Sequence, residues 1–189
     1  MTGVAKLVAR GLIGGLFVGH GTQKLRGWFG GPGLEGTEGM MSALGLYPTR
    51  RNAWAAGLTE TAGGAALALG LATPLASASL IGAMTTAIRK VHLRNGPWVS
   101  NGGYEYNAVL IGALAVLAEE GPGPFSLDRV LGAERSGVAW GLGALALGVG
   151  ASFATVELGH RAAPPVQAQP PAPDTAGDPV TEDDSALSG

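Results

Sequence analysis

The chain contains no cysteine, so it forms no disulfide and holds no metal or cofactor through a thiolate. Charged residues are also scarce, at 14% of the sequence, whereas an average soluble domain has roughly 25%. Hydrophobic residues make up 46%, and 33 of the 189 residues are glycine. Abundant small residues suit helices that pack closely in lipid. This composition predicts an all-α membrane protein.

The acidic residues are unevenly distributed along the chain. The formal net charge is -2, but five of the 14 acids follow residue 161, and without them 9 acids remain against 12 Lys and Arg. So mild a positive balance gives no reason to expect a nucleic-acid partner. Residues 162–189 consist largely of Pro, Ala, Gln, Asp and Ser, so we expect them to be a disordered tail. The five acids are Asp174, Asp178, Glu182, Asp183 and Asp184.

Five apolar segments are predicted to be helices. A full crossing of a bilayer takes about 20 residues, with a range of about 17–25. Four segments reach that length, whereas the fourth is short and is expected to lie inside the bundle or to tilt. The pair Thr73-Pro74 is a helix-start signal, so the connection between the second and third segments should be tight. The segments are 4–20, 53–71, 73–92, 104–118 and 138–156.

Lys and Arg fall mostly in the loops on one side of this arrangement. The positive-inside rule then places the linker 21–51, the third linker and the tail in the cytoplasm, with the N-terminus outside. The first apolar run lacks a small-residue cleavage site and is interpreted as a retained span. We therefore predict a multi-pass membrane protein whose C-terminal tail is cytoplasmic. Eight basic residues (Lys24, Arg26, Arg50, Arg51, Arg89, Lys90, Arg94 and Arg161) lie on the cytoplasmic side, against Lys6, Arg129 and Arg135 on the other.

The linker 21–51 is long and carries two adjacent aromatic residues, Trp28 and Phe29, followed by the stretch GMMSALGLY at 39–47. Aromatic side chains concentrate at membrane–water interfaces. We therefore predict an amphipathic or re-entrant element at the membrane interface.

Two ionisable residues, Arg10 and Glu60, fall inside the first two apolar segments, where a charge needs a partner or a cavity. Glu60 lies roughly 12 Å from the cytoplasmic start of its helix, and Arg10 roughly 15 Å from the cytoplasmic end of its own. Antiparallel neighbours would bring them level, so we predict a buried Arg10–Glu60 ion pair. Such a pair either locks the two helices together or serves a ligand or a proton.

Further polar residues gather at the cytoplasmic ends of the predicted helices. They suggest a pocket for a quinone or another small ligand, although histidines at this depth are more commonly satisfied by water and backbone. A haem held between two histidines is a less favoured alternative. No metal site is predicted, and no motif identifies a catalytic residue. The candidate ligand-binding residues are His20, Gln23, Lys24, Glu60, His92, Tyr104 and Glu105.

Seven short stretches, in the order found here, resemble the DoxX family of small bacterial membrane proteins. They are Arg10 with Gly11-Leu12, GHGTQKL at 19–25, FGGPG at 29–33, TETAGGAAL at 59–67, LGLATPLA at 69–76, GGYEYNAVL at 102–110 and GPGPFSLD at 121–128. The resemblance implies a bundle of four membrane helices over 1–128, and it implies the bacterial inner (plasma) membrane as the location. A connecting segment with a fifth apolar helix at 129–161 and the tail at 162–189 depart from that pattern.

The resemblance also implies a redox setting. A quinone-reducing thiosulfate-oxidising system contains DoxX-like subunits, and a mycobacterial relative is linked to a membrane complex with superoxide dismutase and a sulfurtransferase. The family's polar residues correspond here to Arg10, His20, Gln23, Lys24, Glu60, Tyr104 and Glu105.

We therefore expect a membrane subunit or anchor of a redox complex, not catalytic alone, that contacts lipid, partner proteins and a quinone. The alternatives are a small-solute transporter that uses Glu60 and a purely structural scaffold. Small residues on the third and fifth apolar segments would either dock a partner or pack the chain's own bundle.

Overall fold

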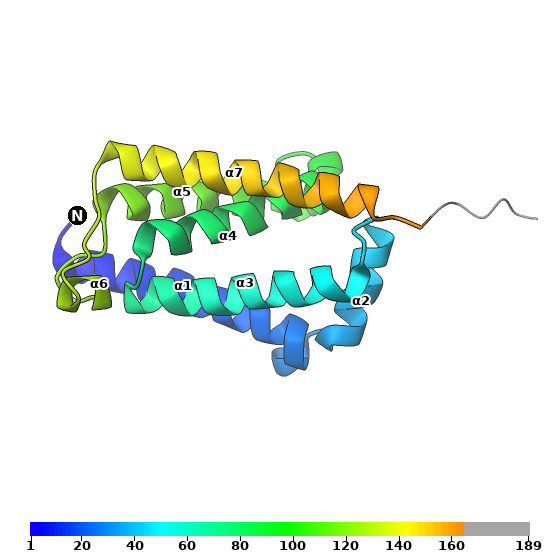
Figure 1. The fold of residues 1–189 in the computed structure, drawn as a ribbon, viewed down its shortest axis with the longest axis horizontal. Helices are drawn as coiled ribbons and strands as arrows, with labels where there is room; N and C mark the ends of the chain where they lie inside the picture. The colour runs from blue at the N-terminus through cyan, green and yellow to red at the C-terminus, as the bar shows by residue number, and fades with distance from the viewer. Residues whose placement is uncertain (165–189) are drawn as a thin grey trace, which may run out of the picture.

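The computed structural model describes residues 1–164, and every described element is helical, which confirms the all-α prediction. Five helices lie side by side as a bundle: α1 (Gly3–Arg26), α3 (Thr49–Leu69), α4 (Thr73–Ala87), α5 (Glu105–Glu120) and α7 (Val138–Arg161) (Figure 1). The disorder predicted for 162–189 falls outside the described residues except for 162–164. The division of the chain at 128 and 161 stays a prediction.

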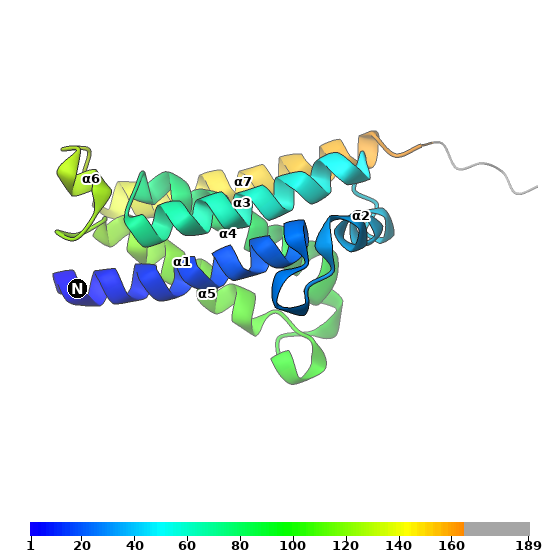
Figure 2. The same ribbon diagram turned by 90° about the horizontal axis from the view of Figure 1, so that it is seen from below.

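Short helices connect the long ones. The linker after α1 forms η1 (Trp28–Gly30) and α2 (Gly33–Ala43), the latter at the end of the bundle (Figure 1). Beyond α4 the chain continues as a π-helix, η2 (Ile88–His92), then as η3 (Leu93–Asn95) and η4 (Val99–Asn101). A single turn, α6 (Leu127–Val130), lies between α5 and α7. The η1 and η3–η4 segments project from the same end of the bundle (Figure 2).

The bundle consists of a pair and a trio of helices. Helix α1 packs along α3, and α4 packs against α5 and α7, which also contact each other. The most extensive helix contact between the two groups is that of α3 with α4, since only residues 70–72 separate these helices. The tight connection predicted at Thr73-Pro74 is therefore confirmed, with Pro74 in the first turn of α4.

Glycines allow α1 and α3 to approach closely. A Cβ atom on Gly64 would lie 2.6 Å from the carbonyl oxygen of Gly14, and one on Gly21 would lie 2.6 Å from the amide nitrogen of Thr61. Neither distance leaves room for a side chain, so the backbones themselves are in contact. These contacts set the register of the two antiparallel helices, with Gly14 opposite Gly64.

The small residues of α4 and α7 serve the chain's own bundle at the positions that face each other. A Cβ atom on Gly148 would lie 2.6 Å from the carbonyl oxygen of Ala78, and one on Gly82 would lie 3.1 Å from that of Gly148. Gly143 and Gly150 of α7, by contrast, have open space around them. The bundle therefore uses one side of α7 and leaves the other free.

Among residues 1–164, α7 is the one helix that is both long and apolar enough to cross a membrane on its own. The sequence had suggested four such segments. The difference arises because α1 carries Lys6 and Arg10, α3 carries Glu60, and α4 and α5 have 15 and 16 residues. Large apolar side chains are nevertheless exposed on the outer faces of the bundle: Val8, Leu12, Leu58, Leu69, Val109, Val116, Leu142, Leu147 and Phe153.

The eight basic residues assigned to one side belong to segments at one end of the bundle, which we call the basic end. Here α1, α4 and α7 end, α3 and α5 begin, and α2 lies (Figure 1). The opposite end carries the N-terminus, the turn between α3 and α4, and α6.

Candidate functional site

Lys24 and Glu60 form an ion pair between α1 and α3. Lys24 Nζ donates to Glu60 Oε2 at 2.5 Å, with the Glu60 side chain 8% exposed and that of Lys24 21% exposed. A carboxylate with so little access to water needs a compensating cation. The glycine contacts of α1 with α3 bring the last turns of α1 beside Glu60, and so provide that cation from Lys24.

The predicted Arg10–Glu60 ion pair is wrong. Arg10 is fully buried near the opposite end, where Nη2 donates to the carbonyl oxygen of Phe125 at 2.6 Å. The prediction ended α1 at residue 20 and began α3 at residue 53, whereas the helices run to Arg26 and from Thr49. In the observed register Glu60 lies beside a part of α1 that is at least two turns beyond Arg10. The two residues are therefore separated by roughly 12 Å along the helix axis.

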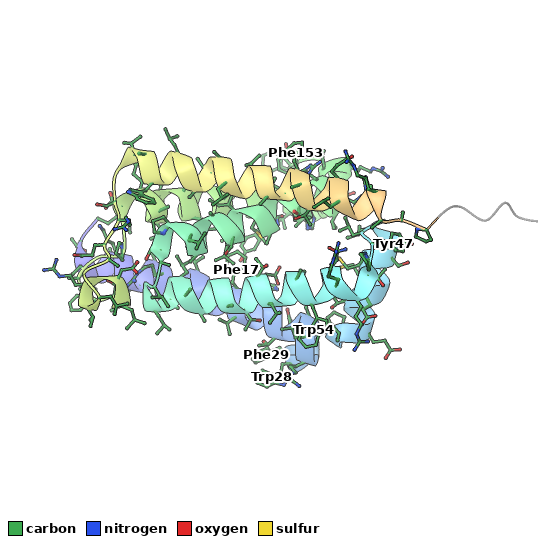
Figure 3. All side chains as sticks on the ribbon, viewed as in Figure 1. Phe17, Trp28, Phe29, Tyr47, Trp54 and Phe153 are labelled. Carbon is green, nitrogen blue, oxygen red and sulfur yellow. The ribbon has the colours of Figure 1, made fainter. Side chains whose placement is uncertain are left out.

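The ion pair lies in the wall of a cavity with a volume of about 250 Å³. Helix α1 forms one side, the end of α4 with η2 another, and the start of α5 a third. Most of the wall is apolar, with Phe17 in the middle of the bundle (Figure 3). The polar side chains in the wall are His20, Lys24, Glu60, His92, Tyr106 and Asn107.

Four of the seven predicted ligand-binding residues line this cavity together, namely His20, Lys24, Glu60 and His92. They come from three segments that are distant in the sequence but share the basic end of the bundle. The proximity of these residues was predictable from the sequence because helices of alternating direction end at predictable sides of a bundle.

The other three predicted residues do not line the cavity. Gln23 packs against Gly31 of the linker, where a Cβ atom would come within 2.6 Å of the Gln23 backbone. The Glu105 carboxylate accepts a hydrogen bond from the Val99 amide at 3.0 Å, and the Tyr104 amide donates to the Gly96 carbonyl at 3.2 Å. Tyr104 and Glu105 therefore organise the loop before α5.

Tyr106 and Asn107 take the places in the cavity wall that sequence analysis assigned to Tyr104 and Glu105. Asn107 is buried, and its amide lies 3.3 Å from the sulfur of Met84 on α4. It precedes the buried Leu110 by three residues, so both occupy one face of α5. The spacing of Asn107 from Leu110 could have indicated that Asn107 faces the interior. That inference requires knowing that α5 begins at Glu105.

The imidazole of His92 is oriented by the loop that follows η2. His92 Nδ1 lies 2.7 Å from the carbonyl oxygen of Gly102, which also accepts from Asn95 Nδ2 at 3.1 Å. A carbonyl oxygen only accepts, so Nδ1 carries the hydrogen, and Nε2 of a neutral ring retains its lone pair. No group of three or more His, Asp or Glu side chains in the described range is arranged to hold a metal ion.

The cavity occupies a gap between α1 and α5. The backbones of these two helices are not closely packed against each other. Toward the opposite end the gap is bridged, because Lys6 Nζ donates to the carbonyl oxygen of Glu120 at 2.5 Å and Arg10 contacts Phe125. Leu16 in the cavity wall is 45% exposed. The cavity is thus an apolar slot at the side of the bundle with polar groups at one end.

A second buried polar cluster, which sequence analysis missed, surrounds Asp128 near the opposite end. Asp128 is 2% exposed, and its carboxylate accepts from the amides of Ala72 at 2.7 Å and Thr73 at 3.0 Å, and from Thr73 Oγ1 at 3.0 Å. It therefore caps the start of α4 from α6. The start of α4 could have indicated this cap. The first amides of the helix need a hydrogen-bond acceptor, and the preceding residues do not supply one.

Arg10 lies beside this cap. A Cβ atom on Gly70 would overlap its guanidinium, and one donor of that group holds the carbonyl of Phe125. Asp128 thus attaches the segment after α5 to the turn between α3 and α4, and Arg10 attaches the same segment to α1.

The DoxX family model matches residues 5–93, from the first turns of α1 into η3. The match includes His20, Lys24, Glu60 and His92, whereas Tyr106 and Asn107 lie beyond it. DoxX is a family of membrane proteins. Neither a curated protein nor a solved structure matches the chain.

Proposed function

Over residues 5–93 the chain belongs to the DoxX family, and we propose that it is a membrane-embedded subunit of a redox complex that binds a quinone headgroup in the cavity between α1 and α5. The observation that carries this proposal is the Lys24–Glu60 ion pair in the wall of an otherwise apolar cavity at the side of the bundle.

The shape of the cavity supports an amphiphilic ligand. Its volume of 250 Å³ is slightly below that of most ligand pockets, which span about 300–1,000 Å³. That volume suits a single substituted ring better than a nucleotide. A ligand dissolved in lipid can enter between α1 and α5, where the two backbones are not closely packed and Leu16 is 45% exposed.

The polar groups of the cavity suit a quinone carbonyl or hydroxyl. Lys24 can donate a hydrogen bond, Glu60 can accept one, and Nε2 of a neutral His92 can accept another. Tyr106 and Asn107 add donors from α5. The ring would thus be held between the apolar wall and the basic end.

The membrane setting is supported by the outer surface and by the distribution of charge. Exposed apolar side chains cover the outward faces of α1, α3, α5 and α7, and lipid is the solvent in which such a surface is stable. The basic end is then the cytoplasmic end, and the protein spans the inner membrane several times, with residues 162–189 on the cytoplasmic side.

Catalysis by this chain alone is not part of the proposal. The chain has no cysteine, so sulfur or thiol chemistry in the complex must be carried out by partner proteins. The chain's own contribution is to anchor those partners and to hold the quinone.

The proposal is tested by isolating the full chain in a mild detergent and identifying bound quinones and proteins by mass spectrometry, with a visible spectrum of the same sample. We expect a quinone and redox proteins to co-purify with the wild type, and the Glu60→Gln variant to lose the quinone while it keeps its partners. Glu38→Gln is the matched control, because Glu38 pairs with Arg50 on the surface, 3.3 Å away.

Other outcomes point to other functions. A monomer free of both ligand and partner contradicts the proposal. A Soret band indicates haem instead of quinone. Failed assembly of Glu60→Gln without any bound quinone in the wild type indicates a scaffold, and altered solute flux in vesicles indicates a transporter.

A further inference from the structure

The chain has three lysines, and they differ in how their charge is balanced. Lys6 Nζ lies 3.3 Å from Glu120 Oε2, and Lys24 Nζ lies 2.5 Å from Glu60 Oε2. Lys90 has no carboxylate partner in the part of the chain that the structure describes. Its Nζ lies instead 2.9 Å from His160 Nε2, which must accept from an ammonium group.

Two arginines close to Lys90 in the sequence also have no carboxylate partner in the described range. The guanidinium of Arg89 stacks on the Phe153 ring at 3.8 Å and donates to the Ser152 carbonyl at 3.1 Å. Arg94 is exposed, and neither arginine forms an ion pair within residues 1–164. We call Arg89, Lys90 and Arg94 the basic cluster.

The nearest acids in the described range are already engaged. Glu157 on α7 accepts from Arg161 at 2.7 Å. Glu105 accepts from the Val99 amide. The cations of the basic cluster therefore have no carboxylate partner within residues 1–164.

The remainder of the chain leaves the described fold beside this cluster. The contact between Lys90 and His160 places the last turn of α7 against η2, and residues 162–164 connect α7 to the remainder of the chain, 165–189. Those residues contain five acids and no Lys, Arg or His. Asp174, the first acid, is fourteen residues beyond His160, so the chain can span up to roughly 45 Å between them.

We propose that the acidic segment 174–184 docks on the basic cluster formed by Arg89, Lys90 and Arg94. Opposite charges face each other across a short tether, and a tether raises the local concentration of the acids to the millimolar range. Contacts that are weak singly are then populated, and they are sensitive to salt because they lie at the surface. His92, which lines the cavity, belongs to the same η2 segment, so the docked acids lie beside the cavity.

The test is zero-length cross-linking with a carbodiimide, which joins an amine to a carboxylate only when they are in contact. The full chain is reconstituted in nanodiscs that contain phosphatidylglycerol, cross-linked at low salt, and analysed by peptide mass spectrometry. The Lys6–Glu120 link serves as the internal reference, because this pair is partly exposed and lies at the opposite end.

We expect links from Lys90 to one or more of Asp174, Asp178, Glu182, Asp183 and Asp184. Half-molar salt should reduce them at least fivefold while the reference link changes less. A mixture of isotopically labelled and unlabelled chains should show that the links are within one chain. A variant with these five acids changed to Asn or Gln should make Lys90 more reactive toward an amine-specific label.

Two results would overturn the proposal. One is the absence of Lys90 links to the acidic segment while the reference link forms. The other is the appearance of those links only in nanodiscs of neutral phosphatidylcholine, which would assign the basic cluster to anionic lipid headgroups instead.

Discussion

Lys24 Nζ and Glu60 Oε2 lie 2.5 Å apart across the contact between α1 and α3, in the wall of a cavity that is otherwise mostly apolar. The two residues are brought together by glycines that let the helices touch, since Gly14 and Gly64 set the register. The pair therefore depends on the packing of the two helices as well as on its own charges, and each can be tested by substitution.

Removing one partner of the pair should destabilise the bundle more than removing both. Lys24→Met leaves the nearly buried Glu60 without a cation. Removing one partner of a buried ion pair typically lowers the unfolding free energy by about 3–5 kcal/mol. The loss should be smaller here because Lys24 is partly exposed. The double variant Lys24→Met with Glu60→Met should recover much of that loss. The measurement is a double-mutant cycle from reversible unfolding in detergent. Equal stability of the double and single variants would argue against an electrostatic pair.

The contact between α1 and α3 should not tolerate a side chain at Gly64. Gly64→Val would insert methyl groups where the Gly14 carbonyl lies, so we expect a loss of at least about 2 kcal/mol in unfolding free energy. Gly15→Val is the matched control, because nothing lies within 4 Å of a Cβ atom at that position. Similar losses for both variants would mean that the contact is not as close as described.

The cap that Asp128 supplies should control the start of α4. Asp128→Asn keeps the size of the side chain but removes the charge that faces two amides and the helix N-terminus, so we expect a loss of about 1–2 kcal/mol. Hydrogen exchange should accelerate at Ala72 and Thr73. Exchange at the start of α3 provides the control, since Asp128 makes no contact there, and unchanged protection of Ala72 would contradict the cap.

The carboxyl of Glu120 should titrate below its usual range, with a consequence for stability at acid pH. Hydrogen bonds from the amino group of Met1 and from Lys6 lower the pKa of Glu120. A lowered pKa contributes stability that is present above the unfolded-state pKa and is lost as pH falls through the folded-state pKa. Lys6→Met should raise the pKa of Glu120 in an NMR titration, whereas Lys6→Arg should leave it lowered. An unchanged pKa in Lys6→Met would rule out a contribution from Lys6.

Much of the fold follows from the sequence because long apolar segments and proline mark helices directly. The segment predicted at 73–92 corresponds to α4 and η2, which together cover Thr73–His92. The predicted ends of α1 and α3 were less accurate, since both helices continue past the apolar residues into polar ones. Helical hydrogen bonding does not stop where hydropathy does, so apolar runs underestimate helix length.

The candidate site was predictable where it depends on helix ends and not where it depends on register. His20 and His92 share a cavity because α1 and α4 run in the same direction. The partner of Glu60 was missed because its level against α1 is set by the contact of Gly14 with Gly64, which no local pattern reveals. The cap by Asp128 was missed for a similar reason, since it acts on residues far away in the sequence.

The central claim is that the slot between α1 and α5 binds a quinone headgroup, and photoaffinity labelling tests it most directly. The full chain in nanodiscs is labelled with a short-chain azidoquinone, and the modified peptides are mapped by mass spectrometry. Leu16→Trp places a larger side chain in the cavity wall and so reduces the space for a ligand. Leu12→Trp, one turn away on the exposed outer face, is the control. We predict saturable labelling of the start of α5 that falls at least tenfold in Leu16→Trp and persists in Leu12→Trp. Labelling that is spread over all outer faces and is equal in both variants would contradict the account.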